Sequence, residues 1–304
     1  MTMNLLEQLN QQFSIDKHLT FTQGKGGLAV ISVTTPQANA TISLQGGQVL
    51  SYTPEGSEHD LLFVSNNAYF QSDKAIKGGA PICWPWFAAH AENDALPFHG
   101  FVRNQAWQVR ATECRDNGDV MITLVFNDTE QTRNLWPYSF ELKEVITVGA
   151  CLGIDLITHN TGLQAFSLTQ AIHTYFSVGD ITQVKVTGLE NKPYIDKVEQ
   201  FAVKNQTGPI TVNQEVDRIY QQVDSPLVIR DAAYNRDIRI EHTGSATAVV
   251  WNPWLDISRQ SQDLEDESYQ HFICVETANA ADDIITVAPG DTWTLSVEYC
   301  IPDQ

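Results

Sequence analysis

The sequence has few positive charges, few cysteines and no long apolar run, and each shortage excludes a class of protein. Its 304 residues include 18 Lys and Arg against 37 Asp and Glu, a formal net charge of −19. Nucleic acids and anionic membranes bind to cationic surfaces, so we expect neither as a partner. The N-terminal MTMNLLEQLN lacks the features of a secretion signal, and no run of eighteen apolar residues occurs. This pattern predicts a cytoplasmic chain without a membrane span.

The cysteines are too scattered to suggest a disulfide framework or a metal site. Cys83, Cys114, Cys151, Cys274 and Cys300 include no C-x-x-C pair, so we expect reduced thiols. The eight histidines show no H-x-H or H-E-x-x-H spacing. Neither a G-x-S-x-G elbow nor a glycine-rich nucleotide loop is present. We therefore expect no metal and no nucleotide.

Strand-forming sequence is abundant along the whole chain. Residues 2–13 suggest a short helix within an N-terminal extension, residues 1–20, and segments rich in β-branched and aromatic residues follow it. No period of twenty to fifty residues and no linker interrupts the pattern. We predict one all-β domain over residues 1–304, a sandwich of large antiparallel sheets. The predicted strands lie in residues 27–35, 40–46, 119–128, 139–149, 153–160, 166–178, 182–188, 226–232, 246–252, 271–277 and 292–300.

The segment QAIHTYFSV, residues 170–178, sets one histidine among apolar and aromatic neighbours. The two-residue period of a strand places His173 on one face with Ala171, Tyr175 and Ser177. That face is the more polar of the two. A hydrogen-bonded core histidine is the alternative interpretation, because buried polar groups are usually paired.

The segment HFICVETA, residues 271–278, places a carboxylate on an otherwise apolar strand face. Alternation groups Glu276 with Phe272 and Cys274, and a glutamate is rarely buried without a partner. A surface residue at the strand end is the alternative. A buried glutamate is a suitable general base near neutral pH, and histidine is the natural acid. Glu276 and His173 would together form a complete acid and base set.

Two cations flank an aromatic stretch, and they suggest an anion site. Trp84, Pro85 and Trp86 predict a rigid wall that stacks on a sugar ring. Lys77 and Arg103 can hold a phosphate, the arginine by paired hydrogen bonds and the lysine as a point charge. Ordinary surface salt bridges explain both cations equally well.

Two further polar residues are candidates for contacts with sugar hydroxyls. His99, beside Gly100, is placed to donate a hydrogen bond to a sugar oxygen. Asp217, in the segment VDRIY, is placed to orient a hydroxyl. An internal ion pair between Asp217 and Arg218 is the alternative.

In combination these motifs resemble the hexose-6-phosphate mutarotases, also called glucose-6-phosphate 1-epimerases, of the aldose 1-epimerase superfamily. GGAPICWPWF, HGFVR, AIHTYFSVGDI, VDRIY, WNPW and CVET occur in the family's order between residues 27 and 299. The chain departs from the family pattern at two positions. Lys77 stands where the family usually has arginine, and Ala88 where glycine is common.

The resemblance implies a galactose mutarotase-like β-supersandwich and assigns roles to the candidate residues. His173 and Glu276 would be the acid and base that open and close the ring of a hexose 6-phosphate, without metal or other cofactor. His99, Asp217 and Trp84 would contact the sugar, and Lys77 and Arg103 its phosphate. The expected partner is this small-molecule substrate alone, bound by a monomer.

Two other functions remain open on the sequence alone. A noncatalytic module that binds or senses a sugar phosphate would need the cations and aromatic rings but no acid and base. A glycosidase normally uses paired carboxylates rather than a histidine and a glutamate.

Overall fold

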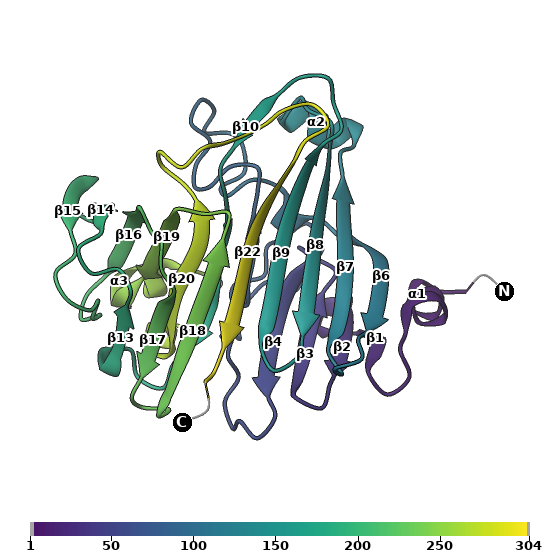
Figure 1. Ribbon diagram of the computed structural model, residues 1–304, viewed down its shortest axis with the longest axis horizontal. Helices are drawn as coiled ribbons and strands as arrows, with labels where there is room; N and C mark the ends of the chain where they lie inside the picture. The colour runs from purple at the N-terminus through teal and green to yellow at the C-terminus, as the bar shows by residue number, and fades with distance from the viewer. Residues whose placement is uncertain (1–2, 303–304) are drawn as a thin grey trace.

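The computed structural model describes residues 3–302, which form mainly antiparallel strands (Figure 1). The alternation of apolar and polar side chains determines which face of each strand is buried. In β8 (Phe140–Val148) and β9 (Leu152–Asn160), every second residue is buried. An apolar residue at every second position of an extended chain buries one face of a sheet. The predicted all-β architecture is confirmed.

One long sheet of eight strands runs across the molecule (Figure 1). Its central pairings, β22 (Thr292–Cys300) with β9 and β9 with β8, are antiparallel and in continuous register. In spatial order its strands are β13 (Val184–Thr187), β17 (Leu227–Asp231), β18 (Arg236–Thr243), β22 (Thr292–Cys300), β9, β8, β7 (Val120–Asn127) and β6 (Gln108–Cys114).

Two further sheets lie behind the long sheet in the view of Figure 1. A four-stranded sheet backs β6 to β9, and a second eight-stranded sheet, here called the site sheet, backs β17 and β18. The four-stranded sheet comprises β1 (Leu19–Gln23), β2 (Ala29–Thr34), β3 (Ala38–Ser43) and β4 (Gln48–Pro54). The site sheet has the order β15 (Ala202–Asn205), β14 (Pro193–Asp196), β16 (Val216–Gln221), β19 (Thr247–Asn252), β20 (Phe272–Asn279), β11 (Gln170–Ile172) and β5 (Ile82–Cys83), with β12 (Tyr175–Ser177) also paired to β20. A small ribbon pairs β10 (Phe166–Leu168) with β21 (Ile285–Val287).

Helices are short and peripheral. The predicted N-terminal helix is confirmed as α1 (Leu5–Phe13), closed by a capping box between Asn4 and Glu7, while residue 2 of that prediction lies outside the described part. The others are α2 (Glu130–Leu135), α3 (Trp254–Gln260) and the 3₁₀ turns Lys25–Gly27, Val102–Asn104, Ile181–Gln183 and Ser268–His271. Across residues 3–302, no helix has the length and apolar character that crossing a membrane requires.

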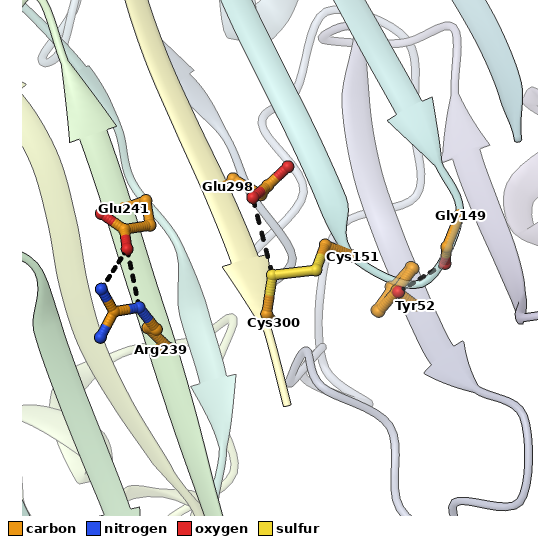
Figure 2. Close-up of a disulfide and its surroundings, with 7 residues drawn as sticks. All are labelled: Tyr52, Gly149, Cys151, Arg239, Glu241, Glu298 and Cys300. Carbon is orange, nitrogen blue, oxygen red and sulfur yellow. Dashed lines mark hydrogen bonds and ion pairs between the residues drawn. A yellow bond between two sulfur atoms is a disulfide. The ribbon is translucent and has the colours of Figure 1, made fainter. Parts of the chain in front are cut away.

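The expectation of five reduced thiols is wrong for two cysteines. Cys151 and Cys300 form a disulfide, with Cα atoms 4.6 Å apart (Figure 2). The register of β22 on β9 pairs Tyr299 with Leu152, so the next cross-strand position brings the two cysteines opposite each other. They are 149 residues apart in sequence, and spacing gave no sign of the contact. Cys83, Cys114 and Cys274 are free, as expected.

Candidate active site

The site sheet carries a pocket of about 220 Å³ on the face that turns away from the main core. Strand alternation produces this division. Val250 and Val275 belong to the main core, whereas Val249 and Glu276 lie on the opposite face. The pocket is lined by Lys77, Phe87, Phe98, His99, Arg103, His173, Tyr175, Lys197, Asp217, Val249, Trp251 and Glu276.

His173 lies where β11 ends and before β12 begins. Its backbone N–H donates to the carbonyl of Pro81 at 2.9 Å, outside the strand pairing. The imidazole stacks on Tyr175, with ring centroids 4.9 Å apart, and meets the ring of His99 edge to face at 5.4 Å. The ring is therefore held between aromatic neighbours, with 8% of the residue exposed.

Glu276 faces His173 across the pocket. It lies inside β20 rather than at a strand end, and 1% of it is exposed. Its Oε1 lies 3.3 Å from Nε2 of His173. The second carboxylate oxygen of Glu276 and Nδ1 of His173 are both buried without a hydrogen-bond partner. The structure thus brings the predicted acid and base together and leaves hydrogen-bonding capacity on each.

Burial determines the charge of this pair. Burial, followed by the positive charges of Arg103 and Lys77, lowers the pKa of His173 to about 3. Burial also raises the pKa of Glu276 well above its ordinary value, with a smaller contribution from Asp217. In the unliganded pocket the single proton of the pair therefore lies on the carboxyl, and both groups are neutral.

His99 is held as a hydrogen-bond donor. Its Nδ1 accepts a hydrogen bond from the backbone N–H of Ala88 at 3.0 Å, and the backbone N–H of His99 donates to the carbonyl of Ala88 at 2.7 Å. Burial, followed by the charges of His173 and Arg103, lowers the pKa of His99. A neutral ring whose Nδ1 accepts must carry its hydrogen on Nε2. His99 can thus donate to a ligand in the pocket.

The two predicted cations both line the pocket, and they differ in how they are paired. Nζ of Lys77 lies 3.7 Å from a carboxylate oxygen of Asp263 and 5.8 Å from the ring centre of Trp251. Arg103 donates from Nη2 to the carbonyl of Phe98 at 2.8 Å, and its buried Nε has no partner. Within residues 3–302 Arg103 makes no ion pair, so its charge remains available to an anion.

Asp217 is paired with a lysine that sequence reasoning did not identify. Nζ of Lys197, which follows β14, lies 2.6 Å from Oδ2 of Asp217. The backbone N–H of Lys197 also donates to the carbonyl of Asp217 at 2.9 Å. The suggested pairing of Asp217 with Arg218 does not occur, because neighbouring residues of a strand point to opposite faces; Arg218 lies near Asp196 instead. No motif in the sequence marked Lys197.

The predicted sugar contact of Trp84 is wrong. Its side chain is fully buried, and its indole N–H donates to the hydroxyl of Thr158 in the long sheet at 3.0 Å. Cys83 packs on the pocket side of the site sheet, so the next residue of the chain points into the main core. The rings that line the pocket are those of Phe87, Phe98, Tyr175 and Trp251. Trp251 lies in the segment VVWNPW, and alternation from Val249 would have identified it.

Among the described residues, one group of three potential metal ligands comes together, and it lies outside the pocket. Cys151, Glu298 and Cys300 have ligand atoms within 4.8 Å of one another on the long sheet (Figure 2). Both sulfur atoms of this group are bonded to each other in the disulfide.

The sequence pattern that describes aldose 1-epimerases matches residues 29–300. The chain belongs to the aldose 1-epimerase family. It is 41% identical, over 254 residues, to a protein of Salmonella typhimurium that is provisionally named glucose-6-phosphate 1-epimerase; the match covers 83% of this chain and 84% of that protein.

Solved structures of related proteins have the same fold as this chain. A crystal structure described provisionally as a mutarotase of Salmonella typhimurium superimposes with a TM-score of 0.89 at 36% identity, covering 96% of both chains. A galactose mutarotase-like protein of Clostridium acetobutylicum superimposes with a TM-score of 0.71 over 95% of this chain and all of the other. That pair is 14% identical, so it shows the fold alone. The predicted galactose mutarotase-like architecture is confirmed.

Proposed function

We propose that this aldose 1-epimerase interconverts the α and β anomers of a hexose 6-phosphate, with glucose 6-phosphate as the preferred substrate. The observation that carries the proposal is the buried contact of 3.3 Å between His173 and Glu276, in a pocket that also presents Lys77 and Arg103. The provisional name of the Salmonella relative gives the same substrate. A sensing module would need the cations but not the acid and base, so the pair favours an enzyme.

Ring opening requires one proton to be removed and one to be added. The carboxylate of Glu276 takes the proton from the C1 hydroxyl while protonated His173 gives a proton to the ring oxygen, and the bond between C1 and the ring oxygen breaks. The product is the open-chain aldehyde. After rotation about the C1–C2 bond, the two groups act in reverse as the ring closes on the other carbonyl face.

The phosphate can set the pair in its reactive charge state. The protein's own groups favour a neutral pair, because burial and then Arg103 and Lys77 keep the pKa of His173 low. A bound phosphate would compensate the charges of those two cations, which raises the pKa of His173. Both cations lower the pKa of His173, whereas Arg103 is only a minor cause at Glu276, so this change favours transfer of the proton from Glu276 to His173, which gives the carboxylate base and the imidazolium acid. Binding of the substrate's remote group would in this way prepare the chemistry at C1.

The remaining polar groups suit a sugar ring. His99 offers an N–H donor, and Asp217 offers a carboxylate held by Lys197. Phe98 is half exposed, and with Trp251 it supplies aromatic surface for the apolar face of a ring. We assign His99 and Asp217 to sugar hydroxyls.

We also propose that the chain works as a single domain, as a monomer and in the cytoplasm. The long sheet joins strands from residue 108 to residue 300, which supports a single domain. Phosphorylated hexoses carry charge that prevents their diffusion through membranes, so an enzyme that uses them belongs in the compartment where they form.

Discrimination between glucose 6-phosphate and glucose tests the phosphate assignment. Arg103→Ala should raise KM for glucose 6-phosphate about ten- to hundredfold, because a charge-assisted pair is lost, and should change KM for glucose far less. Arg110→Ala is the matched control, since this arginine is exposed on β6 and paired to Glu141. Equal losses on both sugars in Arg103→Ala would show that the anion site is wrong.

A further inference from the structure

Gln48 holds the backbone on both sides of Lys77. Its side chain, at the start of β4, is fully buried. Its Nε2 donates to the carbonyl of Ile76 at 3.1 Å and to the carbonyl of Gly78. These two bonds use both protons of the amide. The carbonyls of both neighbours of Lys77 are therefore held by one side chain that does not itself line the pocket.

The turn before Gln48 touches the segment that carries the other cation. The backbone N–H of Gly46 donates to the carbonyl of Gln105 at 2.7 Å, just beyond the 3₁₀ turn that contains Arg103. Gly46 has a φ of +80°, and a Cβ there would lie 2.9 Å from the carbonyl oxygen of Arg103. Only glycine allows so close an approach in this conformation. The turn thus contacts the backbone of Arg103, while Gln48, which follows the turn, binds the carbonyls on either side of Lys77.

Two buried polar groups without partners face this turn. Oε1 of Gln48 has no donor, and neither carboxyl oxygen of Glu144 has a partner. Glu144 occupies an inward position of β8 and is fully buried. A Cβ on Gly47 would lie 2.8 Å from Oε2 of Glu144, and one on Gly46 would lie 3.5 Å from Oε1 of Gln48. Both unpartnered groups therefore border the same pair of glycines.

The chemistry of the two groups is complementary. Burial raises the pKa of Glu144 well above its ordinary value, which favours the protonated carboxyl. A protonated carboxyl has one O–H to donate, and the amide oxygen of Gln48 is an acceptor that lacks a donor. Leaving either group unpaired would cost about 1–3 kcal/mol.

We infer that Glu144 donates a hydrogen bond to Oε1 of Gln48, and that this buried pair is a positioning device which holds Lys77 for the substrate's phosphate. The inference rests on the proposed phosphate site. The hydrogen bond orients the amide of Gln48 so that both N–H groups point at the carbonyls of Ile76 and Gly78. Lys77 is then presented to the pocket with little freedom in its backbone.

The test compares the anion site with the catalytic step. The readouts are KM and kcat for glucose 6-phosphate, turnover of glucose, and the inhibition constant of inorganic phosphate. Gln48→Leu should raise KM for glucose 6-phosphate and the inhibition constant of phosphate about tenfold, with kcat and glucose turnover changed less than about twofold. Glu144→Leu should reproduce that pattern. Glu144→Gln keeps a donor and should retain wild-type constants.

Lys77→Ala separates the positioning role from the phosphate site itself. If Lys77→Ala raises the inhibition constant of phosphate but folded Gln48→Leu and Glu144→Leu do not, the positioning device is wrong and the phosphate site stands. If Lys77→Ala leaves the constant unchanged, both are wrong. Melting temperatures identify variants that fail to fold. Should Gln48→Leu not fold, the comparison of Glu144→Gln with Glu144→Leu decides, and identical constants in those two would overturn the inference.

Discussion

Ala88 holds a backbone conformation that is unfavourable for alanine. Its φ is +65°, in the left-handed region that favours glycine. It is held there by paired hydrogen bonds with His99, which also has a φ of +65°. The loop that presents His99 therefore keeps its shape although this chain lacks the glycine common in the family.

Ala88→Gly should stabilise the protein. The left-handed conformation costs a residue with a Cβ about 1–2 kcal/mol, and the extra backbone entropy of glycine in the unfolded chain offsets about 0.5–1 kcal/mol of that gain. We expect the free energy of unfolding to rise by up to about 1 kcal/mol, measured by urea titration. Ala89→Gly, at the exposed neighbour without a positive φ, is the control and should lower it slightly. A loss of stability in both variants would contradict the account.

At the residue scale, the sequence predicts a role correctly where the chemical type of the residue limits that role. It does not where the role depends on which face of the strand the side chain occupies. His173 and Glu276 were chosen because an imidazole and a carboxylate on strand faces suit proton transfer, and the structure places them 3.3 Å apart. Trp84 was chosen for its ring, but its position beside Cys83 turns it into the core. Glu144 went unnoticed, although alternation with Leu142 and Ile146 marks its inward position.

At the scale of elements, the hairpin of β14 and β15 brings a charge to the pocket. Lys197 follows β14 and is paired to Asp217, whose pKa is raised by burial and lowered again by that lysine. Lys204, on β15 of the same hairpin, is paired with Asp196 and does not line the pocket. The hairpin therefore offers one lysine for a test and one for its control.

Lys197→Met should shift the pH dependence of catalysis to higher pH. Without this lysine, the pKa of Asp217 rises, and so does that of Glu276, which Lys197 at present lowers. The pair reacts with one proton bound and loses that proton as pH rises through the raised pKa of Glu276, so the basic limb of the profile of kcat/KM against pH should move upward. Lys204→Met should leave the limb in place. An unchanged limb in Lys197→Met would show that the hairpin does not affect the site electrostatically.

Strands with one apolar face could be predicted from sequence, and strands with polar or exposed faces could not. The regular alternation in β8 and β9 identifies them at once. β6 has no buried residue and β18 reads RDIRIEHT, with charged groups at many positions, so neither was predicted. Their places follow from pairing with β7 and with β17 and β22, which is a long-range property. The Cys151–Cys300 bond was missed for the same reason.

At the scale of the whole molecule, an acidic protein gathers cations at one place. The chain carries a formal charge of −19, yet Lys77, Arg103 and Lys197 all line one pocket. Two of them are paired to carboxylates, and Arg103 makes no ion pair among the described residues. An anionic ligand repelled by most of the surface would thus meet local positive charge at the site.

The buried acid and base should also shape the pH dependence of global stability. In the folded protein the pair binds one proton, because burial raises the pKa of Glu276 and lowers that of His173 to about 3. In the unfolded chain the groups titrate near 4.5 and 6.5. The unfolded chain thus binds two protons below pH 4.5, one between 4.5 and 6.5, and none above 6.5. Folding is favoured most in the middle window.

We predict that the stability difference between wild type and His173→Asn/Glu276→Gln is flat between pH 4.5 and 6.5. As pH falls below 4.5, the difference should shift against the wild type, because the unfolded pair binds the extra proton. As pH rises above 6.5, it should shift the same way, because the folded pair retains a proton that the unfolded chain releases. On each side of the window, the slope of the stability difference against pH should approach about 1.4 kcal/mol per pH unit. Denaturant unfolding across this range checks it, and a monotonic difference through the window would contradict a neutral pair.

The central claim is that His173 and Glu276 catalyse exchange between anomers of a sugar phosphate. Exchange NMR on glucose 6-phosphate measures this directly, as the rate at which the α and β signals interconvert with and without protein. We predict strong acceleration by the wild type and a loss of about 10²- to 10⁴-fold in kcat in His173→Asn and in Glu276→Gln, with the fold retained. No acceleration by the wild type, or acceleration by either variant as strong as that of the wild type, would contradict the account.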